Sequence, residues 1–135
     1  MLDEPAAGAV ETELRDPTRR SRVSAINLAE IVDVLTRVFE RAPDDVRAAL
    51  ELLEAGGLEV VSVDGDLGMA AGRLHARFYH RRTSPLSMAD CVALASAMSL
   101  NEPLATSDPP LAAAARTVGV VIRPLPDSSG RSSAA

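Results

Sequence analysis

The sequence contains no lysine and no tryptophan, one cysteine, two histidines and only three residues of Tyr and Phe. Because Cys91 is alone, the chain cannot form an internal disulfide, and the lack of paired Cys or His motifs argues against a structural zinc site. The lack of lysine excludes receiver domains and P-loop proteins, both of which need a lysine beside their reactive groups. There is also no Gly-x-Gly-x-x-Gly motif for a dinucleotide.

Long apolar runs are missing as well. No stretch approaches the roughly 18 residues that a membrane span needs, and the acidic start at residues 1–4 has the wrong charge for a secretory signal. We therefore expect a cytoplasmic protein without membrane contact. The net charge of −5 argues against binding nucleic acid by bulk electrostatics, although carboxylates that hold metal ions would contribute to this total.

The 135 residues, 47% of them hydrophobic, are enough for one domain over residues 1–126, followed by a small polar tail at 127–135 that we expect to be disordered. With so few aromatic residues, the core must consist of Ala, Val, Leu and Ile, which suits helices packed closely on a sheet. Cys91 lies in an apolar run and is predicted to be a buried core residue rather than a reactive nucleophile.

The hydrophobic periodicity predicts strands that alternate with helices. The expected strands are residues 22–26, 58–63, 103–106 and 120–123, and the expected helices are 4–14, 27–41, a segment from Pro43 to the Gly56-Gly57 pair, a segment after Asp64, a segment from Ser87, and 109–118. Such alternation indicates an α/β fold with a mostly parallel sheet.

Three acids are predicted near the carboxyl ends of these strands, where the sites of open parallel sheets gather. Glu30 is expected in the first turn of the helix after residues 22–26, Asp90 in the first turn of the helix that Ser87 opens, and Asp108 directly after residues 103–106. Carboxylates without Cys or His partners suit Mg²⁺ or Mn²⁺, and such clusters are typical of phosphoryl chemistry.

Helix capping is the alternative for each acid taken alone. Asn27 and Glu30 have the spacing of a capping box, as do Ser87 and Asp90, and Asp108 precedes a proline as an N-cap residue would. The two roles are compatible, because a first-turn carboxylate can also face the crevice.

Several segments resemble VapC-type PIN domains: SPLSMADCVALASA at residues 84–97, PLATSDPPLAAAA at 103–115, VGV at 118–120 and VSAINLAE at 23–30. The resemblance implies a three-layer α/β/α fold and a metal-dependent endoribonuclease that hydrolyses RNA phosphodiester bonds. It also implies the toxin of a type II toxin–antitoxin pair, with an antitoxin partner and a homodimeric state. Four acids would surround Mg²⁺ or Mn²⁺, and Glu30, Asp90 and Asp108 match the second, third and fourth.

Thr106 and Ser107 lie where the family often has a hydroxyl near the metal, with strand-end capping as the alternative. The first, central strand and its acid have no counterpart in this sequence, so we expect a start codon assigned too far downstream. A catalytically impaired module that binds RNA or an antitoxin without cleaving is the alternative function, and a DNA-directed nuclease is a weaker one.

Arginines at the end of the helix after Asp64 are candidates for contact with an RNA backbone. Their alternative role is to complement the dipole of that helix at its C-terminus. The candidates are Arg73, Arg77, Arg81 and Arg82, with Arg19, Arg20 and Arg22 as further possibilities.

Overall fold

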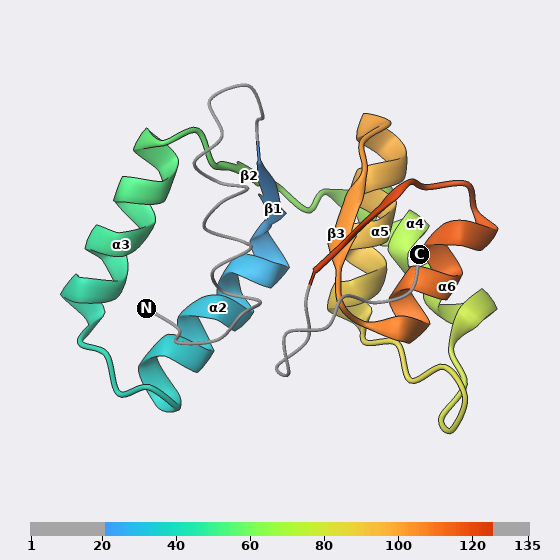
Figure 1. The fold of residues 1–135 in the computed structure, drawn as a ribbon, viewed down its shortest axis with the longest axis horizontal. Helices are drawn as coiled ribbons and strands as arrows, with labels where there is room; N and C mark the ends of the chain where they lie inside the picture. The colour runs from blue at the N-terminus through green and yellow to red at the C-terminus, as the bar shows by residue number, and fades with distance from the viewer. Residues whose placement is uncertain (1–20, 126–135) are drawn as a thin grey trace. The chain divides into compact units, whose positions relative to one another are not determined.

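The computed structural model describes residues 21–125, which fall into two compact units at residues 21–62 and 63–125 (Figure 1). Within the described range the chain forms five helices, α2 to α6, and short strands that pair in parallel. No helix there is long and apolar enough to span a membrane. The predictions for the helix at 4–14, for Arg19 and Arg20, and for the tail lie outside the described residues.

The unit of residues 21–62 pairs two strands and carries two helices. Strand β1 (Arg22–Ser24) is followed by α2 (Ala25–Arg37), α3 (Pro43–Ala55) and β2 (Glu59–Val61), and β1 pairs with β2 in parallel. Arg22 lies opposite Glu59 in this register, and the Arg22 Nε atom is 3.0 Å from Glu59 Oε2. The ion pair therefore links the two strands through their side chains.

The start of α2 differs from the prediction. The predicted strand at 22–26 ends at Ser24, because the Ser24 side chain accepts a hydrogen bond from the backbone N–H of Asn27 (3.1 Å) and begins the helix there. The expected capping box of Asn27 and Glu30 was therefore wrong. Glu30 lies in the second turn of α2, not in the first.

The end of α2 also comes earlier than the predicted residue 41. The helix ends at Arg37, and Glu40 adopts a left-handed backbone conformation (φ 52°) that a continuing α-helix cannot contain. Pro43 then takes the first position of α3, where its missing N–H costs nothing. Gly56 ends α3, as predicted for this glycine pair, and Gly57 has a positive φ of 109°.

The unit of residues 63–125 contains α4 (Gly65–Phe78), α5 (Met88–Leu100), β3 (Leu104–Thr106), α6 (Pro109–Thr117) and β4 (Ile122–Pro124). Strands β3 and β4 pair in parallel. The last strand begins two residues later than predicted, and the strand predicted at 58–63 is limited to β2. The α/β class and the parallel pairing are confirmed.

Helix α5 forms the centre of this unit. Seven of its thirteen residues are buried, among them Cys91 and Leu94, which are fully inaccessible to solvent. The apolar faces of α4 and α6 supply Leu74, Leu111 and Ala115 to the same cluster. The prediction of a buried Cys91 is confirmed. The three-layer arrangement and the absence of a first, central strand stay predictions.

Candidate functional site

Asp90 lies in the first turn of α5 and is held there by a reciprocal capping box. The Ser87 side chain accepts a hydrogen bond from the Asp90 backbone N–H (3.0 Å), and Asp90 Oδ2 accepts one from the Ser87 backbone N–H (3.0 Å). Only one carboxylate oxygen takes part in this box. The second oxygen has no protein donor within the described part of the chain, so Asp90 can cap α5 and still offer a ligand atom.

Asp108 is the N-cap residue of α6 and follows β3 after one intervening residue. Its Oδ2 atom accepts a hydrogen bond from the Leu111 backbone N–H (3.1 Å), while its own backbone N–H donates to Thr106 Oγ1 (3.0 Å). Thr106 is buried at the end of β3. The Thr106 hydroxyl therefore holds the backbone at Asp108 in place. This contact corresponds to strand-end capping, the alternative role given for Thr106 in the sequence analysis. Ser107, between them, is half-buried.

Both carboxylates lie at one end of the 63–125 unit. Strands β3 and β4 point toward this end, and α5 and α6 both begin there (Figure 1). Helix N-termini carry partial positive charge and are common positions for acidic side chains. Asp90 and Asp108 therefore lie at the starts of two helices that begin at the same end of this unit. Their role as site residues stays a prediction.

Glu30 belongs to the other unit, where it is exposed on α2. Across residues 21–125, no three side chains of His, Cys, Asp or Glu form a group that could hold a metal ion. The donor chemistry nevertheless suits Mg²⁺ or Mn²⁺, because such ions take carboxylate oxygens, keep several waters and often use one or two carboxylates together with a substrate phosphate. Asp90 and Asp108 meet that description.

Cys91 is adjacent to the site but takes no part in its chemistry. Burial raises the pKa of the Cys91 thiol, and the negative charge of Asp90 raises it further. A buried thiol with a raised pKa is neutral at physiological pH and is a poor nucleophile. Its role is that of a small core residue, as predicted.

The predicted RNA-contacting arginines of α4 and its following loop all lie on the surface. Arg73 and Arg77 are part of α4, and Arg81 and Arg82 are exposed in the loop that follows it. Arg77 also lies over the Phe78 ring, with its guanidinium carbon 4.6 Å from the ring centroid. Arg22 is instead paired with Glu59 between β1 and β2.

Comparison with protein-family models gives a match to the PIN domain over residues 1–117 of the 135. The chain belongs to the PIN domain family. PIN domains are generally metal-dependent nucleases and often occur in toxin–antitoxin systems. No curated protein matches the chain. The match agrees with the family resemblance stated from the sequence and covers most of the segments that carried it.

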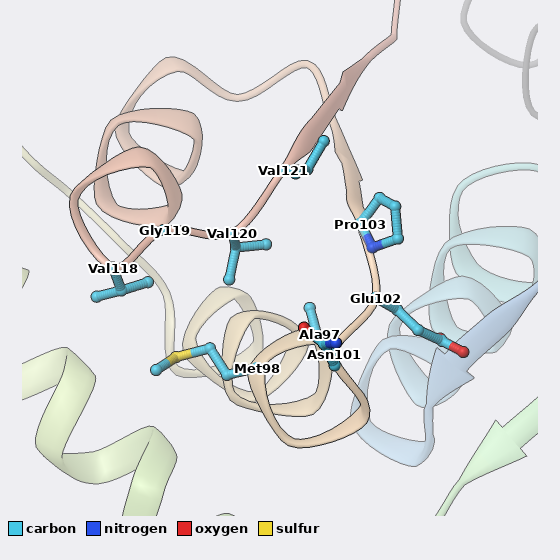
Figure 2. Close-up of a pocket in the computed structure, with 9 residues that line it drawn as sticks. All are labelled: Ala97, Met98, Asn101, Glu102, Pro103, Val118, Gly119, Val120 and Val121. Atoms are coloured by element: carbon cyan, nitrogen blue, oxygen red, sulfur yellow. The ribbon is translucent and has the colours of Figure 1, made fainter.

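The structure of this PIN domain also contains two features that the sequence did not lead us to expect. A pocket of about 360 Å³ opens between the C-terminal end of α5 and the turn after α6, lined by Ala97, Met98, Asn101, Glu102, Pro103 and residues 118–121 (Figure 2). It lies at the end of α5 away from Asp90, and Glu102 is its one titratable lining residue. The pocket is therefore separate from the candidate nuclease site.

The second unexpected feature is an aromatic stack that begins on α4. The rings of His75 and Tyr79 have centroids 4.7 Å apart and an interplanar angle of 18°. The spacing in the sequence carries a signal for this contact, because residues four apart on a helix are surface neighbours. We considered the two histidines in the sequence only as possible zinc ligands, so this stack was not predicted.

Proposed function

We propose that this PIN domain is a metal-dependent endoribonuclease and the toxin of a type II toxin–antitoxin pair. The observation that carries the proposal is the position of Asp90 and Asp108. Each carboxylate lies at the start of a helix at the carboxyl end of parallel strands, and each has one oxygen outside its cap hydrogen bond. Because the chain belongs to a family of nucleases, we interpret these two acids as ligands of a catalytic metal ion.

In this proposal Asp90 and Asp108 hold a divalent cation, Mg²⁺ or Mn²⁺, through their remaining oxygens. When bound, such a cation lowers the pKa of coordinated water and stabilises the negative charge that develops on a phosphodiester oxygen. The capping box and the Thr106 hydroxyl keep the two carboxylates in place before substrate arrives. For Glu30 the proposal rests on the resemblance alone, and its role there is to orient or deprotonate water.

The antitoxin partner and the homodimer are parts of the same proposal. Ile31, Val34 and Val38 are exposed on α2 and at its C-terminal end and recur at helical spacing, so they form one apolar stripe. Exposed apolar stripes of this kind are typical of surfaces that bind another protein. This stripe supports a protein partner for the chain.

The test is cleavage of a fluorophore-quencher RNA by the purified chain with Mg²⁺ or Mn²⁺, and with excess EDTA. We expect cleavage that requires the metal and is lost in Asp90→Asn and in Asp108→Asn. Asp66→Asn is the matched control, because Asp66 is also a first-turn acid but lies on α4 rather than on α5 or α6. Equal cleavage by wild type and Asp90→Asn would refute the assignment of Asp90 to the nuclease site. A matched DNA substrate separates an RNA-directed from a DNA-directed enzyme.

A second candidate function is a PIN module that binds RNA or an antitoxin without cleaving. It is favoured by the finding that residues 21–125 contain no group of three metal-ligating side chains. This candidate predicts that the folded chain shows no metal-dependent cleavage, while calorimetry or fluorescence anisotropy still detects the bound partner.

A further inference from the structure

The charge of the chain is strongly segregated around the end of α4. Between residues 67 and 89 the sequence has four arginines and two histidines but no Asp or Glu, although the whole chain carries a net charge of −5. Within residues 21–125 none of these four arginines forms an ion pair with an acid. This surface therefore attracts anions that the rest of the chain repels.

A flat aromatic surface lies within the same segment. Tyr79 keeps 46% of its surface exposed even though its ring stacks on His75 at 4.7 Å. His75 is half-buried on α4, so it supports the Tyr79 ring from a fixed position. A large exposed ring that is already held in place loses little conformational entropy when a further ring stacks on it.

The loop after Tyr79 is a closed turn. The backbone groups of His80 and Ser84 exchange two hydrogen bonds, of 2.8 and 2.9 Å. Inside this turn, His80 Nδ1 accepts hydrogen bonds from the backbone N–H groups of Arg82 (3.2 Å) and Thr83 (3.3 Å). Arg81 and Arg82 are thus carried on a short, internally bonded turn that immediately follows the aromatic stack.

The turn also lies at the same end of the 63–125 unit as the two acids. It connects the end of α4 to the start of α5, where Asp90 lies, and Figure 1 shows this loop in yellow at the lower end of the unit, where α6 also begins. Helical periodicity places Arg73 and Arg77 on the other side of α4 from His75 and Tyr79. Tyr79, Arg81 and Arg82 are therefore the residues best placed to act together.

We propose that Tyr79, Arg81 and Arg82 form a binding surface for single-stranded RNA beside the proposed cleavage site, with a base stacked on Tyr79 and phosphates paired with the two arginines. The choice of RNA as the ligand rests on the proposed function. The single-stranded form follows from the geometry, because bases inside a duplex are already stacked and cannot reach an aromatic side chain on a surface. Arginine suits the phosphates through its planar, bidentate donors.

The experiment is fluorescence anisotropy with a short, labelled RNA that has no internal pairing, in EDTA so that no cleavage occurs. We expect Tyr79→Ala to weaken binding between about 5-fold and 150-fold, the range found for loss of one base-aromatic stack. Tyr79→Phe keeps the ring and should bind like wild type. Replacing Arg81 and Arg82 with Ala should reduce the slope of log Kd against log salt by about 0.7 for each phosphate that is no longer neutralised.

Arg47→Ala is the matched control, because Arg47 is an exposed helical arginine in the 21–62 unit. It should leave binding unchanged. Wild-type affinity in Tyr79→Ala, equal loss in Tyr79→Phe and Tyr79→Ala, equally tight binding of duplex RNA, or no binding by wild type would each overturn the inference. Urea unfolding of each variant shows whether a loss of binding reflects unfolding.

The cleavage assay fails or succeeds separately from this binding assay. Binding that depends on Tyr79 without metal-dependent cleavage refutes the nuclease and keeps the RNA surface. Cleavage combined with binding that is insensitive to Tyr79 refutes the RNA surface alone.

Discussion

Asp90 offers a substitution series that separates its structural role from its proposed role in metal binding. In the structure its Oδ2 atom accepts a hydrogen bond from the Ser87 backbone N–H, and its charge lies in the first turn of α5. Asp90→Ala removes both contributions. Asp90→Asn keeps an oxygen that can accept from the Ser87 N–H and removes only the charge. Ser87→Ala removes the other half of the capping box and leaves the carboxylate in place.

The magnitudes follow from these contacts. Loss of the Ser87 side-chain acceptor should cost about 1 kcal/mol of stability, as for other N-cap residues. Loss of the Asp90 charge alone should cost about 0.3–1 kcal/mol through the helix dipole. Asp90→Ala should cost more than Asp90→Asn, because it also leaves the Ser87 N–H without its acceptor. With a urea m-value of about 1–3 kcal/mol/M, a loss of 1 kcal/mol lowers the urea midpoint by about 0.3–1 M.

Two assays read the two roles. Urea unfolding followed by circular dichroism gives stability, and isothermal titration with Mn²⁺ gives metal binding. We expect Ser87→Ala to lose stability but keep Mn²⁺ binding, whereas Asp90→Asn keeps most of its stability and loses Mn²⁺ binding. Wild-type Mn²⁺ affinity in Asp90→Asn would refute Asp90 as a ligand. Equal destabilisation by Asn and Ala would refute the hydrogen-bond acceptor as the part of Asp90 that stabilises α5.

Three further predictions concern the unit around α5. Leu94→Ala should cost about 3–5 kcal/mol in urea unfolding, since this side chain is fully buried, and a cost below about 1 kcal/mol would contradict the assigned core. Cys91 should react with a thiol reagent only as the chain unfolds. Because burial raises the pKa of the thiol, its contribution to stability is complete below the pKa of the unfolded thiol and is lost as the pH rises toward the pKa of the folded one. A urea midpoint that rises over that pH range would contradict this prediction. Asn101 has a φ of 53°, so Asn101→Val should cost about 1–2 kcal/mol and Asn101→Gly very little; equal midpoints for both variants would argue against a left-handed residue there.

The helix caps show which features could be predicted from local sequence and which could not. Ser87 and Asp90 form the predicted capping box, and Asp108 caps α6 ahead of a proline as expected, because both motifs depend only on groups three residues apart. The same reasoning was wrong at Asn27 and Glu30. There Ser24, which was predicted to lie in a strand, begins the helix earlier and moves Glu30 into the second turn.

The sequence by itself determined the α/β class, the parallel pairing, the burial of Cys91 and the family, because periodicity, apolar runs and segment order are properties of the chain. Only the tertiary structure placed Asp90 and Asp108 at one end of the 63–125 unit with a single oxygen of each engaged. It alone showed Tyr79 stacked on His75 next to a closed turn. These arrangements depend on how the elements pack and on which donors each side chain meets, and the four-residue spacing of His75 and Tyr79 only makes their contact possible.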